Sequence, residues 1–336
     1  MSRRPSHADR PDQLHQTDQL HQTQRGTLMR AIQFSTFGGP AVLSAVDVPR
    51  PVAGPGEALV GVAGTTFNQV DAAIRSGFMQ GAFPIALPHT PGIDVSGTVV
   101  EVGTGVGGEL VGRDVIAFLP MTAPGSAAEF VIVPAALLAT APVSIPLPDA
   151  AALASSGLTA WQAVAEHAEV RAGQRVLVNG AGGGVGGFVV QLAARAGATV
   201  IATAGARSRA AVIAHGAAEV IDYTATPVPD AVEGPVDVVV NLVRTTPDET
   251  AALVALVKPG GAFVSTTTPG IAEGAGIRVS SVFARSDAEQ LARLSELVDA
   301  GELEIDVSER HPLADLPLVH ARGAAGELRG KVVLAP

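Results

Sequence analysis

The stretch "RVLVNGAGGGVGGFVVQLAARAGATVIATA", residues 175–204, decides the fold of this 336-residue chain. Its first five residues form an apolar run that ends at glycine, which is typical of a buried strand. The run over 187–197 predicts an amphipathic helix, and 199–204 predicts a second strand. The same alternation continues to residue 268, and its strands are apolar on both faces. We therefore expect an α/β domain with a doubly wound, parallel six-stranded sheet.

The turn between the first strand and the helix is rich in glycine. Gly182, Gly184 and Gly187 satisfy the spacing GxGxxG. Glycine there permits a tight turn and lets backbone N–H groups approach a pyrophosphate at the positive end of the helix dipole. The motif alone is weak evidence, and a glycine-rich turn without a ligand is the alternative. The preceding strand and following helix make a dinucleotide-binding turn the stronger interpretation.

The residues after the second strand indicate which dinucleotide would bind. A site for NAD normally has a carboxylate about 20 residues after the glycines, but no Asp or Glu occurs between Gly180 and Ala218. Arg207, Ser208 and Arg209 stand there instead. Guanidinium groups suit a 2′-phosphate, so the sequence favours NADPH. The alternative is that these arginines are only solvated residues of a first helical turn.

Composition excludes several classes of function. The formal net charge of −10 argues against nucleic-acid binding, and no apolar run is long enough for a membrane span. Cysteine is absent, which removes disulfides, thiolate catalysis and cysteine-containing zinc sites. We expect a soluble, cytoplasmic protein with a small-molecule substrate.

The chain divides into four stretches. Residues 1–27 are polar and contain the tandem repeat "DQLHQTDQLHQT", so we expect a disordered tail rather than a His-bearing metal or partner site. Residues 28–150 contain short apolar runs between Gly/Pro turns, with one helical turn near 69–76, and predict a β-barrel-like domain. Residues 151–284 form the dinucleotide-binding domain, in which 247–261 predicts a helix. Residues 285–336 are expected to complete the first domain.

Several motifs together resemble those of one family. The chain is similar to the zinc-independent medium-chain dehydrogenase/reductases, in their quinone oxidoreductase (zeta-crystallin-like) branch. The resemblance covers residues 30–336 and implies a GroES-like catalytic domain, a Rossmann domain and an active site in the cleft between them. It rests on "FGGPAVL", "AGPGEALVGV", "TFNQVDAAIRSG", "PHTPGIDVSGTVVEVG", "LTAWQA", "RVLVNGAGGGVGG", "VIDY" and "GKVVL".

The resemblance implies roles for individual residues. Asn68 and Asp71 match the family's Asn-x-x-Asp and are the expected catalytic residues; the alternatives are a turn-forming Asn and a helix N-cap Asp. Lys331 either touches the cofactor or sits at a strand edge. The other expected cofactor-binding residues are Thr159, Gly182, Gly183, Gly184, Val185, Gly186, Thr203, Arg207, Ser208, Arg209, Tyr223, Asn241, Leu242 and Phe283.

The resemblance also narrows the chemistry. Zinc-dependent relatives carry a catalytic Cys and a Gly-His-Glu, where this chain has Gly92-Ile93-Asp94 and no cysteine, so we expect no metal. The tyrosine proton donor of many enoyl-thioester reductases is missing from "RSGFMQGAF". Solvent, or else Asp71 or His89, would supply the proton.

These observations predict an NADPH-dependent reductase of quinones or α,β-unsaturated carbonyl compounds. A biosynthetic enoyl reductase and a non-catalytic, crystallin-like NADPH-binding protein are the alternatives. We also expect a homodimer, because the family commonly pairs an edge strand of the Rossmann sheet, here "GIRVSSVF" at 276–283, across a two-fold axis.

Overall fold

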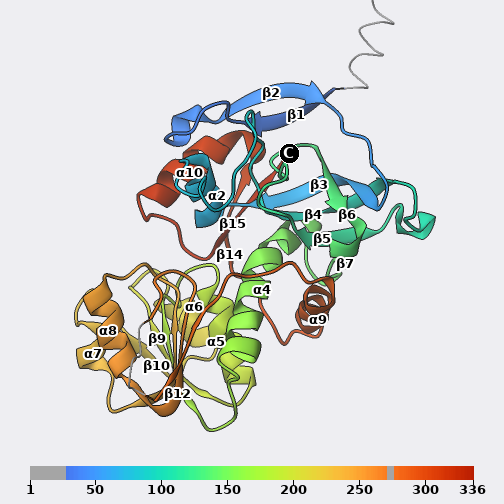
Figure 1. Cartoon of the computed structure of the whole chain (residues 1–336). Coiled ribbons are helices and arrows are strands. Elements are labelled where there is room, and N and C mark those ends of the chain that lie inside the picture. Colours follow the sequence, from blue (N-terminus) through green and yellow to red (C-terminus); the bar gives the residue numbers. More distant parts are fainter. Residues whose placement is uncertain (1–27, 271–275) are drawn as a thin grey trace, which may run out of the picture.

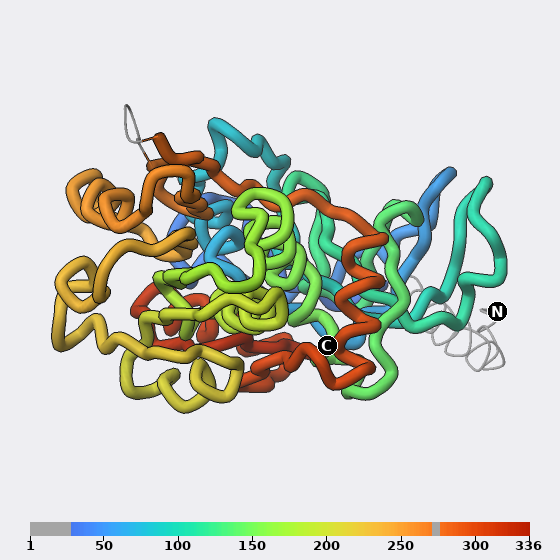
Figure 2. The backbone as a smooth tube through the Cα atoms, turned by 90° about the horizontal axis from the view of Figure 1, so that it is seen from below, coloured from blue at the N-terminus to red at the C-terminus, as the bar shows by residue number. Residues whose placement is uncertain are grey.

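The computed structural model describes residues 28–270 and 276–336. The predictions for residues 1–27 lie outside the described residues. Figure 1 shows two lobes, one built on a mostly antiparallel sheet and the other on a parallel sheet. In Figure 2, which views the chain from below, late segments in red lie among early segments rather than in a separate block.

Six strands form the parallel sheet: β8 (Arg175–Asn179), β9 (Thr199–Thr203), β10 (Glu219–Ile221), β11 (Val236–Asn241), β12 (Val257–Ser265) and β13 (Arg278–Ser281). Their order is β10-β9-β8-β11-β12-β13, and every pair is parallel. The direction of winding changes between β8 and β11, which creates a topological switch point. The expected doubly wound, six-stranded sheet is confirmed.

Helices cover both faces of this sheet, because alternate residues of its strands are apolar on opposite sides. Val176 and Val178 of β8 pack in one core cluster, and Leu177 packs in another on the opposite face. The flanking helices are α5 (Gly186–Arg195), α6 (Arg209–Ala214), α7 (Val228–Ala231) and α8 (Pro247–Ala255).

The predicted helix over 247–261 is wrong in its last third. A capping box formed by Thr246 and Glu249 starts α8, but the helix ends at Ala255, and Val257 already belongs to β12. Pro259 has no N–H to continue a helical ladder, and Gly260 adopts a φ of 82°. The apolar run is therefore shared between a helix and a strand.

The other lobe contains a seven-stranded sheet. Its strands are β3 (Glu57–Thr66), β4 (Asp94–Val102), β5 (Asp114–Phe118), β6 (Phe130–Pro134), β7 (Ala139–Thr140), β14 (Val307–Pro312) and β15 (Lys331–Ala335). The order is β14-β15-β3-β4-β5-β7, with β6 also paired to β3. The last strand, β15, is antiparallel to β3 and parallel to β14. Two further strands, β1 (Leu28–Gln33) and β2 (Ser44–Pro49), pair with each other.

Helices fill the space around and between the two lobes (Figure 1). They are α2 (Gln69–Arg75), α3 (Leu147–Ala150), α4 (Ala154–Trp161), α9 (Ala288–Asp299) and α10 (Leu316–Ala324), with short 3₁₀ turns at Pro40–Val42, Gly108–Leu110, Ala135–Leu137, Ala151–Leu153 and Leu313–Asp315. Helix α4 continues into a π-helical segment, Gln162–His167, and contacts α5 on one side and β4 and β5 on the other. Among the described residues, no helix has the length and apolarity that a membrane crossing requires.

Candidate active site

The glycine-rich turn follows β8 and therefore lies at the switch point of the parallel sheet. Gly180 adopts a φ of 96°, and a Cβ on Gly186 would collide with the backbone of Gly180 and Ala181. Glycine is thus required at both positions. The N–H groups of Gly184, Val185 and Gly186 donate to no backbone or side-chain acceptor within the described part of the chain. They stand at the positive end of the ten-residue helix α5, where an anion is stabilised.

A hollow opens beside this turn. Its walls include Ser208 and Lys331, which lie where side chains on Gly182 and Gly184 would stand. The nearby carboxylate of Asp306 is paired with Arg329 at 2.6 Å, which offsets its repulsion of an anion. Free N–H donors with almost no side chain around them fit the pyrophosphate of a dinucleotide.

The strand ends beneath the turn hold it by side-chain hydrogen bonds. Thr203 accepts from the N–H of Gly180 at 2.8 Å and donates to Asn179 Oδ1 at 3.0 Å. Asn179 Nδ2 in turn donates to Asn241 Oδ1 at 2.9 Å, and the N–H of Leu242 donates to the Asn179 carbonyl. Thr203 and Asn241 are both buried, so their observed contacts support the turn.

Arg207 and Arg209 follow β9, but their guanidinium groups point to different partners. Arg207 donates to the carbonyls of Gly326 and Glu327 at 3.1 and 2.8 Å and so links α6 to the end of α10. Arg209 donates to the carbonyl of Val220 at 3.0 Å and is exposed.

Ser208 lines the hollow beside Gly182. Tyr223 is exposed and lies next to Gly205, on the side of the sheet that carries Arg209.

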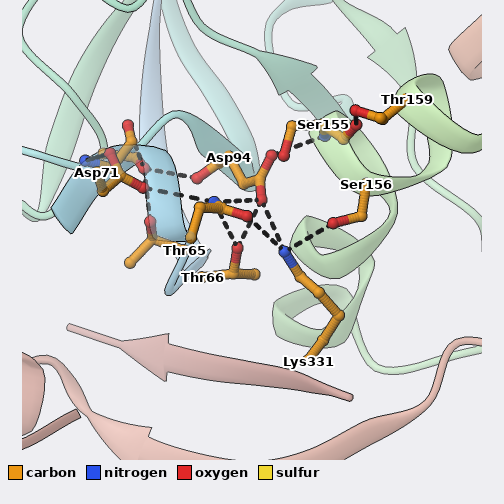
Figure 3. A network of polar contacts seen from close by, with 11 residues as sticks. Thr65, Thr66, Asp71, Asp94, Ser155, Ser156, Thr159 and Lys331 are labelled. Atoms are coloured by element: carbon orange, nitrogen blue, oxygen red, sulfur yellow. Dashed lines mark hydrogen bonds and ion pairs between the residues drawn. The ribbon is translucent and has the colours of Figure 1, made fainter. Parts of the chain in front are cut away.

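A buried polar network occupies the other lobe, centred on Asp94 at the start of β4 (Figure 3). Asp94 is fully buried, and its carboxylate accepts from the N–H of Ser155 at 2.7 Å and from Thr66 Oγ1 at 2.5 Å. Burial by itself raises the pKa of Asp94, but the ammonium of Lys331 and the hydrogen bonds from Thr66 and Asn68 outweigh it, so the pKa is lowered. Asp94 is therefore a carboxylate at neutral pH.

Lys331 reaches this network from the first position of β15 (Figure 3). Its Nζ lies 3.2 Å from Asp94 Oδ2, 3.1 Å from Ser156 Oγ and 2.9 Å from Asn68 Oδ1. These three contacts use all three ammonium donors, and the Lys331 side chain is only 3% exposed. Lys331 is expected either to touch the cofactor or to sit at a strand edge. The second expectation is wrong, because Lys331 is buried and β15 lies between β14 and β3.

Asn68 is the N-cap residue of α2 and makes no capping hydrogen bond. Its Nδ2 donates to Asp94 at 2.9 Å, and Thr66 and Asp71 lie within 3.2 and 3.4 Å of the same nitrogen. Lysine has no acceptor and a carboxylate has no donor, so only this orientation of the amide satisfies its neighbours. Asn68 can therefore make one more hydrogen bond to a ligand, by accepting at the second lone pair of Oδ1.

Asp71 lies in the first turn of α2, so the N-cap alternative is wrong. Its Oδ1 accepts from the N–H of Gly92 at 3.1 Å, which holds the turn before Asp94 against α2. Burial raises the pKa of Asp71 to about 7; the hydrogen bond from Gly92 lowers it, and the charge of Asp94 raises it further. Asp71 thus titrates near neutral pH.

Two aromatic contacts join the lobes. Phe83 stacks on Phe283 with ring centroids 5.2 Å apart, and the guanidinium of Arg244 lies 5.4 Å from the ring of Phe78. Phe78 and Phe283 are 71% and 59% exposed. Phe78 and Phe83 come from the segment after α2, whereas Arg244 and Phe283 follow β11 and β13. Exposed rings therefore stand on both sides of this junction.

Thr159 and His89 each have contacts of their own. Thr159 Oγ1 donates to the Ser155 carbonyl one helical turn earlier, at 2.7 Å. His89 packs edge-on against Phe34, and burial lowers its pKa to about 4, so it is neutral at pH 7. Within residues 28–270 and 276–336, no group of three or more His, Asp or Glu side chains is arranged to hold a metal.

Sequence reasoning misses the partners that make Asn68 part of a network. It names Asp94 only as the last residue of Gly92-Ile93-Asp94, the triplet compared with Gly-His-Glu, and it does not single out Ser155 or Ser156. Four distant segments supply these residues, so no local motif could have found them. Lys331 is predicted to bind the cofactor. Its ammonium donates to Asn68, Asp94 and Ser156, and its side chain also borders the hollow beside the glycine-rich turn.

Comparisons with known proteins agree with this architecture. The family model "Alcohol dehydrogenase GroES-like domain" matches residues 54–143, and "Zinc-binding dehydrogenase" matches residues 215–334. The chloroplast envelope quinone oxidoreductase homolog of Arabidopsis thaliana is 32% identical over 329 residues, which cover 93% of this chain and 99% of the relative.

Solved structures give the same result. The quinone oxidoreductase of Coxiella burnetii is 32% identical with a TM-score of 0.85, over 92% of this chain and 99% of its own. A mycobacterial protein solved in complex with NADPH is 30% identical with a TM-score of 0.77, over 92% of this chain and 100% of its own.

Proposed function

Because the chain belongs to the medium-chain dehydrogenase/reductase family, in its quinone oxidoreductase branch, we propose that it is an NADPH-dependent reductase of quinones or α,β-unsaturated carbonyl compounds. The observation that carries the proposal is the row of three N–H groups at the switch point that have no acceptor among the described residues, on a turn that is mostly glycine. Such a turn suits a dinucleotide and little else of comparable size.

The choice of NADPH over NADH rests on the residues after β9. Arg209 is exposed and donates to the Val220 carbonyl, no carboxylate occurs between Gly180 and Ala218, and Asp222 is near enough for the charge of Arg209 to lower its pKa. Arg207 is engaged by two backbone carbonyls, so we assign the 2′-phosphate to Arg209 and Ser208. The mycobacterial neighbour described in complex with NADPH supports this choice.

Bound NADPH would supply a hydride from its nicotinamide ring. The residues present do not fit a catalytic metal, since Ile93 has no donor atom and Asp94 is paired with Lys331. The two amide hydrogens of Asn68 are committed to neighbours, so Asn68 does not polarise the acceptor carbonyl. The acceptor must therefore be electrophilic by itself, and solvent supplies its proton.

The exposed aromatic rings support a planar acceptor. Phe78 and Phe283 present apolar faces beside the junction of the lobes, and flat quinones or enones stack on such faces. A thioester with a long polar carrier gains less from these surfaces.

Steady-state assays on the purified full chain test the proposal. NADPH oxidation should be fastest with 9,10-phenanthrenequinone or 1,4-naphthoquinone, slower with 2-cyclohexenone and slowest with crotonyl thioesters. NADH should be a poorer reductant with every acceptor. Turnover only with the thioester would favour the enoyl reductase alternative. Saturable NADPH fluorescence without turnover would favour the non-catalytic one.

We also propose a cytoplasmic homodimer. Strand β13 lies at an edge of the parallel sheet, where its outer backbone groups can pair with a second copy across a two-fold axis. Gel filtration with light scattering should give twice the chain mass of 33.8 kDa, and a monomer at all concentrations would exclude this assembly.

A further inference from the structure

Lys331 connects two features that lie far apart in the sequence. Its backbone begins β15 directly after Gly330, whose N–H donates to the carbonyl of Gly182 in the glycine-rich turn at 3.3 Å. Its side-chain stem lies beside Gly184, so that a Cβ there would stand 2.7 Å from Lys331 Cδ. Its ammonium ends on the Asn68 amide, 2.9 Å away. One residue therefore touches both the turn and the network.

We propose that Lys331 is a positioning residue, which fixes the Asn68 amide relative to the glycine-rich turn. This inference rests on the proposed function, together with the place beside the cofactor that the family resemblance implies for Asn68, whose Oδ1 keeps one lone pair for a ligand. The ammonium of Lys331 donates to Asn68 Oδ1. It also binds the carboxylate of Asp94, which accepts the hydrogen bond from Asn68 Nδ2. Both ends of one amide are thus set by one cation.

A simpler role for Lys331 would be to neutralise Asp94. The geometry contains more than that pair, since the contact with Asn68 is shorter than the contact with Asp94 and Ser156 supplies a third anchor. The network also arranges its charges around Asn68, with Asp71, Asp94 and Lys331 all within contact of it. The two roles predict different behaviour once Asp94 is made neutral.

The decisive experiment compares Asp94→Asn with the double variant Asp94→Asn/Lys331→Met. If Lys331 acts only as the counter-ion of Asp94, its loss in the neutral background has no effect on turnover. If it positions Asn68, kcat at saturating NADPH and quinone falls a further 10- to 100-fold, the range seen when a supporting contact of a site residue is lost. The NADPH dissociation constant, measured by fluorescence, should stay within about threefold, because the ammonium does not face the turn.

A second readout does not depend on activity. The chain has three asparagines, Asn68, Asn179 and Asn241, so protein labelled with ¹⁵N-asparagine gives three side-chain amide signals. The Asp94→Asn variants contain a fourth asparagine and give a fourth signal pair, so the pair lost when Asn68→Ala is added to the Asp94→Asn background assigns Asn68. In Asp94→Asn/Lys331→Met, compared with Asp94→Asn, the Asn68 pair should shift and its hydrogens should exchange faster with water, while the Asn179 pair stays unchanged. An unmoved Asn68 pair would overturn the proposal even if the protein had no reductase activity.

The link to the turn has its own test. Gly184→Ala pushes the Lys331 stem, so it should lower kcat at saturating NADPH in the wild type. With Lys331→Ala already present, the stem is gone and only the Gly330 carbonyl, 3.2 Å from the added Cβ, remains close, so Gly184→Ala should lower kcat much less than in the wild type. Additive effects would show that the turn and Asn68 are independent. The matched control is Lys258→Met, which removes the chain's other lysine, whose half-exposed side chain pairs with Asp237 far from the turn, and should leave kcat unchanged.

Discussion

The glycine-rich turn and the Asp94 network are both polar centres, but they are built in opposite ways. In the turn, the polar groups are backbone N–H groups without an acceptor among the described residues, and most positions are glycine. In the network, the polar groups are side chains, and nearly every donor and acceptor is already used within the protein. The first arrangement can accept an anion, whereas the second can only hold its own members in place.

This difference predicts where substitutions change stability and where they change binding. Damage to the saturated network should lower the stability of the protein, because it leaves buried charges without partners. Damage to the open turn and its surroundings should mainly affect the cofactor. Substitutions at both centres, the most disruptive first, test that division.

Asp94→Ala should be the most damaging change. It leaves the Lys331 ammonium buried without its counter-charge, and we expect the free energy of unfolding to fall by about 3–5 kcal/mol. Urea titration followed by circular dichroism measures the change. Arg293→Ala, which breaks the exposed pair with Glu296, should cost less than about 1 kcal/mol. Equal losses in the two variants would contradict a buried ionic network.

Asp71 should make stability depend on pH. Its pKa is raised from 3.8 to about 7 on folding, so between these values the folded protein keeps a proton that the unfolded chain releases. The contribution of protonated Asp71 to the free energy of unfolding is present at low pH and is lost as pH rises through this window. The loss reaches about 4 kcal/mol, at about 1.4 kcal/mol per pH unit.

Two buried histidines oppose this trend. Burial lowers the pKa of His89 to about 4 and that of His320 to about 3, which makes stability rise with pH up to about 6.5. Both histidines are present in wild type and in Asp71→Asn, so the difference in the free energy of unfolding between the two proteins measures the contribution of the Asp71 carboxyl. Unfolding in urea from pH 4.5 to 8 should show the wild type losing stability relative to Asp71→Asn as pH rises. A constant difference would refute the raised pKa.

Gly186→Ala should weaken the binding of both NADPH and NADH, since the added Cβ meets the backbone of Gly180 and Ala181. For the same reason the free energy of unfolding should fall by about 1–3 kcal/mol. Differential scanning fluorimetry and fluorescence titration with NADPH and NADH measure the two effects. Gly39→Ala is the matched control, because a Cβ at Gly39 meets nothing within 4 Å. The close packing of α5 on the turn would be disproved if both alanine variants behaved alike.

Arg209→Ala should have the weakest effect and the narrowest. We expect NADPH binding to weaken by about 1–2 kcal/mol, the range of a charge-assisted hydrogen bond at an exposed site, with NADH unchanged and stability unaffected. Fluorescence titration with each cofactor measures the difference, and Arg293→Ala on the exposed face of α9 serves as control. A parallel loss of NADH affinity would remove the 2′-phosphate assignment.

The two centres also differ in how far sequence predicts them. The turn is encoded by neighbours, so strand, glycines and helix can be located over residues 175–204 from the order of the amino acids alone. The network brings together Asn68, Asp94, Ser156 and Lys331, which meet only when β15 pairs with β3 and α4 packs against β4 and β5. Periodicity carries no information about such pairing. The error at 257–261 has a related cause, because a helix and a strand share one apolar run there.

The position of β15 has a consequence for biosynthesis. Strands β8 to β13 can assemble as soon as residues 175–281 have left the ribosome, because their partners are local. The other sheet begins at Glu57, and β3 can pair with β4 and β6 early, but the end of β3 has to wait for Lys331–Ala335 before it pairs with β15 and before Asp94 acquires its counter-charge. A nascent chain interrupted after α10 would therefore expose an uncompensated acid and an open sheet edge, which are features that chaperones and proteases recognise in unfinished proteins.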